Sequence, residues 1–283
     1  MKGNLMFFVV GATAHFGRQA VDALLAAGQP VRALTRRPES AGLPAGAEVA
    51  VGDLTSEESL VQALSGVEAI FLVLPYQMDV APLVAAARRT GVRRIVFLSS
   101  GAVVDGSATQ PDVIAQYHRD VELAIEESGI EWTFLRLLFP AINSLTFAMQ
   151  LAGGDVIRAA YGQASASVVH ENDVAEVAAA VLPGGHAGKV YDLTGPASLT
   201  QVDQVAILGA ALGRPLVFEE LDDAPVRAQM ANFMDPAFIN ALFDLMAATV
   251  GKPAQVNSVV EDLTGHAPRG YAEWVTDHLA DFS

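Results

Sequence analysis

The fold of this chain is decided near its start, by the stretch Leu5-Met6-Phe7-Phe8-Val9-Val10-Gly11-Ala12-Thr13-Ala14-His15-Phe16-Gly17. An apolar run ends in a turn of small residues, and the turn opens a helix-like segment that stops at Gly28. This strand–turn–helix context is typical of a dinucleotide-binding loop. A helix N-terminus offers unpaired N–H groups and a partial positive charge, which suit a pyrophosphate. We therefore expect cofactor contacts from Gly11, Thr13, His15, Phe16 and Gly17.

The end of the next predicted strand, residues 30–35, indicates which cofactor binds. NAD-binding versions of this motif usually carry an acidic residue there, which holds the ribose 2′-hydroxyl. Here Arg36 and Arg37 come first, and Glu39 is the first acidic residue. A guanidinium binds a phosphate bidentately, whereas a carboxylate repels it. We therefore predict that the two arginines hold a 2′-phosphate and that the cofactor is NADP, with NADPH preferred over NADH. The alternative is a solvated pair of loop arginines.

The composition limits the possible partners. The chain has 283 residues, enough for one large α/β domain with a smaller appended region. It contains no cysteine, which excludes disulfides, thiol catalysis and a thiolate metal site. A net charge of −15 argues against nonspecific binding to nucleic acid or to an anionic membrane. The first residues lack the order of a secretory signal, so we expect a soluble cytoplasmic protein and leave its oligomeric state open.

Strand-like and helix-like segments alternate through the first half of the chain. Further strands are expected at residues 47–51, 68–74, 94–98, 131–135 and 190–193. This alternation predicts an α/β protein with a Rossmann-type, doubly wound parallel sheet. We assign residues 1–195 to an NADP-binding Rossmann domain and residues 196–283 to a smaller, mostly helical, substrate-binding region.

The rhythm changes after about residue 150. Residues 162–167 read as a loop, and Asp173 is expected to cap an alanine-rich helix that ends at Leu182. Farther on, apolar side chains recur at helical spacing at Met230, Phe233, Met234, Ala237, Phe238, Ala241, Leu242 and Leu245. They fit a stripe that faces the core. They also fit the lining of an adaptable apolar substrate pocket.

Several short motifs occur together along the chain. They are Gly11-Ala-Thr-x-x-x-Gly17, the basic end of the second strand, Gly52-Asp53-Leu54, Arg94-Ile-Val-Phe-Leu-Ser-Ser100, His118-Arg-Asp-Val-Glu122, and Ser128-Gly-Ile-x-Trp-Thr-Phe-Leu-Arg136 followed by Asn143. In this set the chain resembles the NmrA-like branch of the atypical short-chain dehydrogenase/reductases, over nearly its whole length. That branch includes quinone and azo reductases, ketone reductases of secondary metabolism such as antibiotic biosynthesis, and cofactor-sensing regulators.

The resemblance implies further cofactor contacts. Asp53 and Leu54 would contact the adenine edge, and Leu74 and Pro75 would lie along the cofactor ribose. Asp53 has a second interpretation, as a loop residue that closes a turn. The family usually has a glycine at the position of Ala14, and a methyl group there crowds the phosphates. This departure bears on cofactor affinity or pose and leaves the predicted fold unchanged.

The catalytic pair of typical short-chain dehydrogenases is missing. Typical members use a tyrosine with a lysine four residues later, which lowers the pKa of the phenol. None of the three lysines, Lys2, Lys189 and Lys252, stands four residues after a tyrosine. Tyr117 lies on the helix expected to carry the pair, and its phenol would need another partner in place of the lysine.

Three side chains are candidates to replace that pair. Ser99 and Ser100 close the fifth predicted strand, where a hydroxyl could donate to a substrate carbonyl oxygen. They could equally satisfy backbone groups at the strand end. His118 could relay a proton or make a structural hydrogen bond. The other histidines show no ligand spacing, so no metal is predicted.

Hydride transfer to an activated acceptor needs little acid from the protein, because a quinone or an internally hydrogen-bonded ketone already stabilises the developing charge. The sequence therefore predicts an NADPH-dependent reductase of a quinone or of a ketone in a small aromatic, polyketide-like molecule. The alternative is a non-enzymatic regulator that senses NADP(H). A sugar-nucleotide epimerase is disfavoured because such enzymes rely on the tyrosine–lysine pair.

Overall fold

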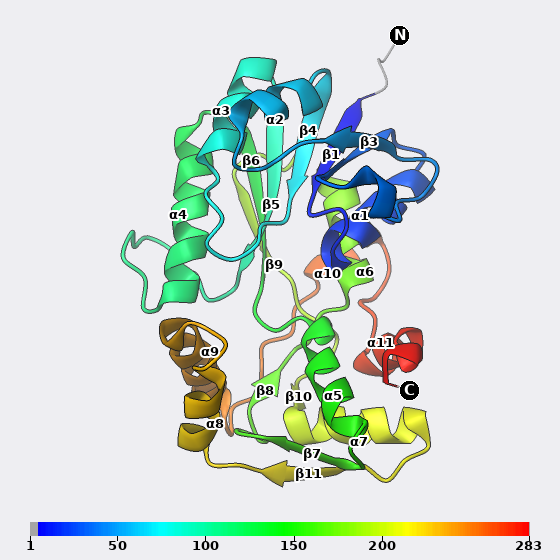
Figure 1. Cartoon of the computed structure of the whole chain (residues 1–283), viewed down its shortest axis with the longest axis vertical. Helices are drawn as coiled ribbons and strands as arrows, with labels where there is room; N and C mark the ends of the chain where they lie inside the picture. The colour runs from blue at the N-terminus through cyan, green and yellow to red at the C-terminus, as the bar shows by residue number, and fades with distance from the viewer. Residues whose placement is uncertain (1–4, 283) are drawn as a thin grey trace.

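A seven-stranded sheet in the order β3-β2-β1-β4-β5-β6-β9 lies in the upper part of the molecule in Figure 1. The computed structural model describes residues 5–282, so Lys2 lies outside the described residues. All six strand pairings in this sheet are parallel. The strands are β1 (Met6–Val10), β2 (Val31–Thr35), β3 (Glu48–Val51), β4 (Val67–Leu72), β5 (Arg94–Ser100), β6 (Glu131–Leu137) and β9 (Lys189–Asp192).

Helices cover both faces of this sheet. One face carries α1 (His15–Ala26), α6 (Glu171–Val181) and α10 (Val259–Thr264), and the other carries α2 (Glu57–Ala63), α3 (Ala81–Thr90) and α4 (Val113–Glu127). Successive side chains of a strand point to opposite faces of the sheet. Phe7 therefore packs on the face covered by α1, α6 and α10, and Phe8 on the face covered by α2, α3 and α4; both side chains are fully buried. The predicted Rossmann-type, doubly wound parallel sheet is confirmed.

Local signals in the sequence set several helix ends. A serine followed by two glutamates predicts a helix start at Ser56, and the Ser56 side chain caps α2 by accepting a hydrogen bond from the Ser59 N–H at 3.4 Å. The Asp112 carboxylate caps α4 by accepting from two backbone N–H groups at 2.9 Å. Gly91 ends α3 with a φ of 76°, a left-handed conformation that glycine adopts without a Cβ penalty.

The start of α6 corrects one expectation. Its N-cap is His170, whose Nδ1 accepts from the Asn172 N–H at 3.1 Å, rather than Asp173. Asp173 lies inside the first helical turn, buried, and its carboxylate accepts hydrogen bonds from Arg269. The helix dipole favours an acidic residue at either position, so the sequence alone does not separate the two.

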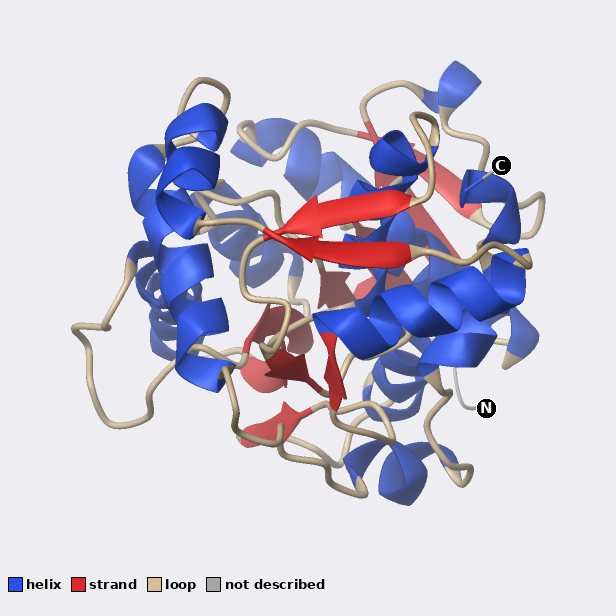
Figure 2. Ribbon diagram, turned by 90° about the horizontal axis from the view of Figure 1, so that it is seen from below, coloured by secondary structure: helices blue, strands red, loops and turns tan. Residues whose placement is uncertain are grey.

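Four short strands lie outside the main sheet, where the sequence indicates loop and helix. The strands β7 (Val156–Ala159) and β11 (Val217–Glu220) pair in parallel, and β8 (Ser165–Ala166) and β10 (Leu199–Thr200) pair antiparallel. With α7 (Gln201–Leu212), the β7–β11 pair forms the lower end of the molecule in Figure 1 and faces the viewer in Figure 2. These strands are too short to show a period, and their partners are distant in sequence.

The second hydrophobic region uses residues from both sides of position 195. Ile157 and Val168 pack in one cluster with Leu208 and with Trp274 of α11 (Tyr271–Asp277). The short elements η2 (Ala141–Phe147), α5 (Ala148–Leu151) and η3 (Leu279–Phe282) contribute to the same cluster. In the opposite direction, α10 returns to the main sheet. The division after residue 195 therefore stays a prediction about domains, and the two hydrophobic regions do not follow it.

The apolar residues between 230 and 245 do not form one core-facing stripe. They belong to two helices, α8 (Asp223–Met230) and α9 (Pro236–Thr249). The Asp235 carboxylate caps α9 by accepting from the Ala237 N–H at 2.8 Å, and a proline at the first helical position favours a new start there. Phe233 falls in the connection and is 85% exposed, whereas Ala241 is buried. Among residues 5–282, no helix is both long and apolar enough to cross a membrane.

Candidate active site

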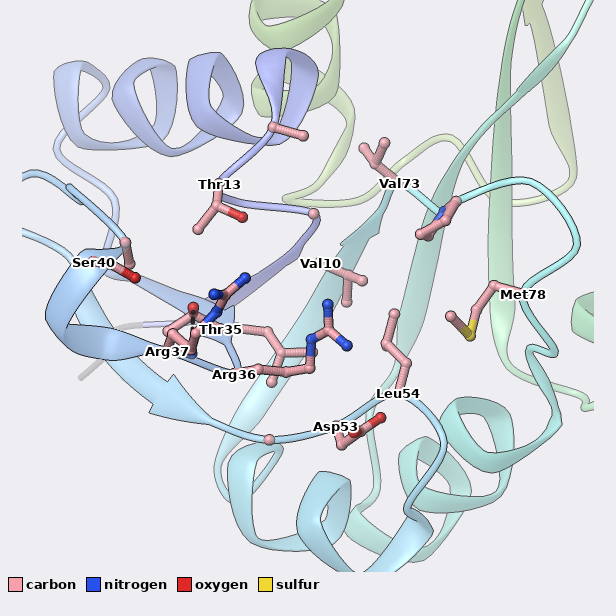
Figure 3. A pocket seen from close by; sticks show the side chains of 16 residues that line it. Val10, Thr13, Thr35, Arg36, Arg37, Ser40, Asp53, Leu54, Val73 and Met78 are labelled. Carbon is pink, nitrogen blue, oxygen red and sulfur yellow. Dashed lines mark hydrogen bonds between the residues drawn. The ribbon is translucent and has the colours of Figure 1, made fainter. Parts of the chain in front are cut away.

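A cavity of about 420 Å³ opens at the carboxyl ends of β1, β2 and β4 (Figure 3). The chain leaves β1 toward β2 on one side and returns at β4 on the other, so this is the switch point at which doubly wound sheets bind ligands. Seven of the predicted cofactor residues line it: Gly11, Thr13, Arg36, Arg37, Asp53, Leu54 and Pro75.

The phosphate loop, residues 11–17, presents the first N–H groups of α1 to an anion. The helix α1 begins at His15, and its N-cap, Ala14, has no side-chain oxygen to bond them. Helix geometry leaves the first N–H groups of α1, those of His15, Phe16 and Gly17, without an intrahelical acceptor. No acidic residue stands in this first turn. The helix terminus is therefore electropositive and open to a pyrophosphate.

Two glycines shape this loop. Gly11 has a φ of 78°, and a Cβ on it would approach the carbonyl oxygen of Val73 to 2.9 Å. A Cβ on Gly17 would lie 2.2 Å from the carbonyl oxygen of Gly11, which is far inside van der Waals contact. The turn and the helix thus approach each other so closely that only glycine, which has no Cβ, fits at these two positions. A backbone without side chains there can lie close to a bound pyrophosphate.

The two predicted phosphate-binding arginines reach the same cavity. Figure 3 shows the Arg36 and Arg37 guanidinium groups between the phosphate loop and Asp53. Neither guanidinium makes a hydrogen bond or ion pair with any of residues 5–282. The short 3₁₀ helix η1 (Pro38–Ser40) follows them and brings Ser40 to the cavity wall. Two unpaired cations and a hydroxyl therefore stand where the sequence predicts the 2′-phosphate.

Asp53 closes a turn, which is one of its two predicted roles, and its contact with the adenine stays a prediction. One carboxylate oxygen, Oδ1, closes a turn by accepting from the Thr55 N–H at 2.9 Å and the Thr55 hydroxyl at 2.8 Å. These two bonds are the main reason that the pKa of Asp53 lies below its ordinary value, and the nearby Arg36 charge adds to them. The residue also lines the cavity, with Leu54 beside it. An ionised carboxylate is therefore held at the edge of the site.

The other four predicted cofactor residues do not line the cavity, and one of them, Gly17, has no side chain. Phe16 packs against the core under α1, and Leu74 packs on the opposite face of the sheet. His15 is exposed at the start of α1. Their backbone groups, rather than their side chains, remain candidates for cofactor contact. Ala14 lines the cavity, with an extended backbone (φ −107°) that an L-residue adopts without strain.

Ser99 belongs to a buried charge network. Its hydroxyl donates to Glu122 Oε1 at 2.7 Å, and Glu122 is 0% exposed. Arg136 grips the same carboxylate with two hydrogen bonds of 2.9 and 2.7 Å, and also donates to Asp105 at 2.8 Å. Arg119 contacts Glu122 at 3.1 Å. The Ser99 hydroxyl is therefore occupied inside the protein, which favours the structural interpretation of this residue.

The other two candidate catalytic groups also have partners within the protein. The Ser100 hydroxyl accepts from the Ala102 N–H at 3.1 Å at the end of β5. His118 Nδ1 lies 2.8 Å from the Ile114 carbonyl oxygen, so this nitrogen carries the proton and donates. Burial lowers the pKa of His118, because a charged imidazole is poorly solvated there. A neutral His118 is held by the preceding turn of α4.

Sequence reasoning missed some residues at both ends of the site. Ser40 and Met78 line the cavity, and Glu122 holds the charge network. Ser40 lies three residues after Arg37 in the same loop, and that proximity was the available signal. The contact between Glu122 and Arg136 could not be predicted from neighbouring positions, because it joins α4 to β6 across 14 residues.

One group of side chains has metal-like spacing outside this cavity. Ligand atoms of Asp173, Glu176 and His266 lie within 4.8 Å of one another. Arg269 already donates to both carboxylates, with 2.7 Å to Glu176 Oε1. A guanidinium supplies the positive charge that a cation would bring, so we interpret the group as an ion-pair cluster.

Comparisons with known proteins agree with this geometry. Residues 11–183 match the model of a family described as NAD(P)H-binding. The chain is 39% identical to the (4-alkanoyl-5-oxo-2,5-dihydrofuran-3-yl)methyl phosphate reductase of Streptomyces griseus, over 98% of this chain and 99% of that protein. It is 31% identical to the NAD(P)H azoreductase of Xenophilus azovorans, over 98% and 99%. The NADPH complex of the quinone oxidoreductase QOR2 from Escherichia coli superposes with a TM-score of 0.79, at 26% identity over 97% and 100%.

The chain therefore belongs to the NAD(P)H-binding family, with atypical short-chain dehydrogenase/reductase-like relatives. It is an NAD(P)H-dependent oxidoreductase with a reductase role. The free helix terminus, the glycines of the loop and the unpaired arginines fit such a cofactor. These findings favour the enzyme over the non-enzymatic regulator.

Proposed function

We propose that this protein uses NADPH to reduce an activated, conjugated acceptor, with a quinone or an aromatic polyketide-like ketone as the first candidate. One observation carries the proposal. The cofactor end of the site has unpaired polar groups, whereas the Ser99 hydroxyl and the His118 Nδ1–H already donate within the protein. The Ser100 hydroxyl accepts a hydrogen bond and keeps its own proton for an acceptor oxygen, so such a site positions its reactants with a neutral serine hydroxyl as the remaining donor among the three predicted catalytic groups.

The cofactor end would hold the dinucleotide through several groups of the chain. The N–H groups at the start of α1 would bind the pyrophosphate, and Arg36, Arg37 and Ser40 would bind the 2′-phosphate. Leu54 and Pro75 would pack on the ring systems. When bound, the nicotinamide supplies a hydride. The chain orients the acceptor and excludes water, and the proton is left to solvent or to the acceptor's own hydroxyl groups.

Two relatives support an acceptor that stabilises its own negative charge. One is named as a quinone oxidoreductase of Escherichia coli and another as an NAD(P)H azoreductase. Quinones and azo compounds are both conjugated electrophiles, in which added electron density spreads over several atoms. A protein that lacks the tyrosine–lysine pair can reduce such compounds because little proton transfer is needed in the transition state.

The Streptomyces griseus relative suggests a second candidate acceptor of the same chemical kind. The furanone in its name has a ring C=C bond conjugated to a lactone and to an alkanoyl carbonyl. Hydride addition there would give an enolate spread over two carbonyl groups. That substrate also bears a phosphate, which a protein would hold with a free cation.

The distribution of positive charge ranks these two candidates. Within residues 5–282, the arginines without an ion pair are Arg36, Arg37 and Arg88. The first two line the proposed cofactor site, and Arg88 lies in the last turn of α3. The one remaining unpaired arginine in this range, Arg88, does not line the cavity, so it is not placed to hold an acceptor phosphate beside the cofactor. An uncharged aromatic acceptor fits this distribution better.

The test is NADPH consumption with a panel of acceptors: simple quinones, an aromatic hydroxyketone and an alkanoyl-butenolide with and without its phosphate. We expect turnover with the quinones, and a loss of less than about 10-fold in kcat for Ser100→Ala and for His118→Ala. General acid–base catalysis contributes about 10²–10⁴-fold, so the two cases separate.

Two outcomes would contradict the proposal. A wild type that binds NADPH and oxidises it with no member of the panel is not a reductase of this class. A drop of 10³-fold in His118→Ala, with fold and NADPH affinity intact, would identify His118 as an obligatory acid. Turnover of the phosphorylated butenolide alone would replace the aromatic acceptor by the second candidate.

A further inference from the structure

A tight turn after β4 forms one wall of the cofactor cavity. Pro75 and Met78 both line the cavity, and the Met78 N–H donates to the Pro75 carbonyl oxygen at 3.1 Å. Between them, Gln77 has a φ of 65°. This is a left-handed conformation that costs a non-glycine residue about 1–2 kcal/mol. A turn that contains such a residue needs support from its surroundings to keep its shape.

Tyr117 of α4 supplies that support. Its hydroxyl lies 2.9 Å from the Pro75 carbonyl oxygen and 3.2 Å from that of Met78. Both partners are acceptors, so the hydroxyl donates to the two ends of the turn. The Tyr76 ring, inside the turn, meets the Tyr117 ring edge-on with 5.1 Å between centroids. One side chain thus fixes both the backbone and the aromatic face of the turn.

The opposite side of the turn rests on the C-terminal region. The Tyr76 ring lies 4.8 Å from the ring of Phe238 in α9. The turn is therefore gripped between α4 and α9, and its two cavity-facing residues are set by contacts that lie behind the cavity wall.

The same geometry makes Tyr117 a poor proton donor. Its hydroxyl hydrogen is shared between two carbonyl oxygens, and no cation lies on the phenol in the part of the chain that the structure describes. Burial raises the pKa of Tyr117 to about 12, the opposite of the change that the missing lysine would cause. Arg119, on the same helix, and Arg136 are bound to Glu122 and not to the phenol.

We propose that Tyr117 is a positioning residue for the cofactor, whose hydroxyl clamps the Pro75–Met78 turn in the shape that packs on the bound dinucleotide. This inference rests on the proposed function, because it assigns the cavity to NADPH. The phenol then contributes to cofactor affinity and leaves the rate of hydride transfer nearly unchanged. Tyr117 lies on the helix expected to carry a catalytic tyrosine, but its hydroxyl donates to backbone carbonyl groups of the turn.

The test is Tyr117→Phe, which removes the hydroxyl and keeps the ring contacts. We expect the Kd for NADPH, from fluorescence titration without acceptor, to rise about 3–10-fold, as for the loss of one or two neutral hydrogen bonds. The KM for NADPH should rise by the same factor, and kcat at saturating NADPH should stay within about twofold. Hydrogen–deuterium exchange should quicken in the peptide that contains Met78.

Tyr191→Phe is the matched control. Its hydroxyl also makes a hydrogen bond, with His186 Nδ1 at 2.7 Å, but it lies at the β9 edge and does not line the cavity. The control should change neither Kd nor kcat. Thermal unfolding of both variants without cofactor would show that each is folded.

Three results would overturn the clamp. They are an unchanged Kd in Tyr117→Phe, an equal rise in Tyr191→Phe, and a kcat loss of 10² or more with Kd unchanged, which would make the phenol an acid. Failure of the proposed function looks different. A wild type that binds NADPH but reduces no acceptor refutes the function and still lets the Kd comparison decide the clamp. A wild type that binds no NADPH refutes both.

Discussion

The two ends of the site treat their polar groups in opposite ways. Around the phosphate loop, the first N–H groups of α1 and the guanidinium groups of Arg36 and Arg37 lack partners within residues 5–282. Around α4 and β5, the side chains of Ser99, Ser100 and His118 are each bonded to a neighbour. Leaving a polar group unpaired lowers stability, so unpaired groups that face a cavity indicate a ligand, whereas paired ones indicate structure.

Gly17→Val gives the largest expected effect and tests the open end. Its Cβ would collide with the Gly11 backbone and displace the phosphate loop, so several N–H contacts to the pyrophosphate would be lost together. We expect the Kd for NADPH to rise more than about 100-fold. Isothermal titration measures it, and circular dichroism shows whether the fold is kept.

Gly153→Val is the control for that substitution, because a Cβ there meets only the Gln150 carbonyl oxygen, at 3.5 Å. It should leave NADPH affinity unchanged. If Gly17→Val binds NADPH as the wild type does, the phosphate does not bind at this loop.

Glu122→Gln tests the closed end. The amide would leave the guanidinium groups of Arg136 and Arg119 without their shared negative charge, in a site where Glu122 is fully buried. Breaking a buried pair in this way costs about 3–5 kcal/mol of stability. Urea unfolding measures the loss, and the exposed Glu127→Gln on the same helix is the control.

The same variant sharpens the comparison of the two ends. At a temperature at which it is folded, Glu122→Gln should keep its NADPH affinity within about threefold, since the network does not line the cavity. A small loss of stability with a large loss of NADPH affinity would mean that the Glu122 network serves cofactor binding and not the stability of the fold.

Replacing both Arg36 and Arg37 by alanine separates the two cofactors. A hydrogen bond to a charged group contributes about 1.5–3 kcal/mol, so affinity for NADPH should fall roughly 10–150-fold, with NADH little affected. Arg88→Ala, which removes another unpaired arginine far from the cavity, is the control. Equal affinity of the wild type for NADPH and NADH would mean that these arginines do not bind a 2′-phosphate.

The smallest expected effect concerns pH and lies far from the cavity. Both ring nitrogens of His278 face carboxylates, Nε2 toward Glu171 and Nδ1 toward Asp281 at 2.8 Å. These contacts raise the pKa of His278 above 6.5, although burial opposes them. The protonated ring therefore stabilises the fold fully below about pH 6.5, and this contribution is lost as pH rises through the folded-state pKa.

His278→Gln should accordingly lower Tm by a few degrees near pH 6 and by less at pH 9. Thermal unfolding across this range measures the difference between variant and wild type. His186→Gln, whose ring pairs with the Tyr191 hydroxyl and not with a carboxylate, is the control. A Tm difference independent of pH would mean that folding does not raise the pKa of His278.

The sequence predicts what depends on neighbouring residues. The strand–turn–helix at Gly11, the cap at Ser56 and the parallel sheet follow from local patterns and are confirmed in the structure. It does not predict the β7–β11 pairing or the Glu122–Arg136 contact, because each joins segments whose encounter depends on the whole fold. Asp235 followed by Pro236 is typical of a helix start and could have predicted the break between α8 and α9. The regular apolar spacing on both sides favoured a single helix instead.

The packing of Trp274 gives the C-terminal region a built-in optical signal. Its indole stacks on the His278 ring at 4.5 Å and 25°, whereas Trp132 stacks on Phe134. A protonated imidazole accepts an electron from an excited indole in contact with it, and a neutral imidazole or a phenyl ring does so far less. Emission from Trp274 should therefore brighten as His278 loses its proton. Fluorescence of the unlabelled protein would then report the charge on one ring while the fold stays intact.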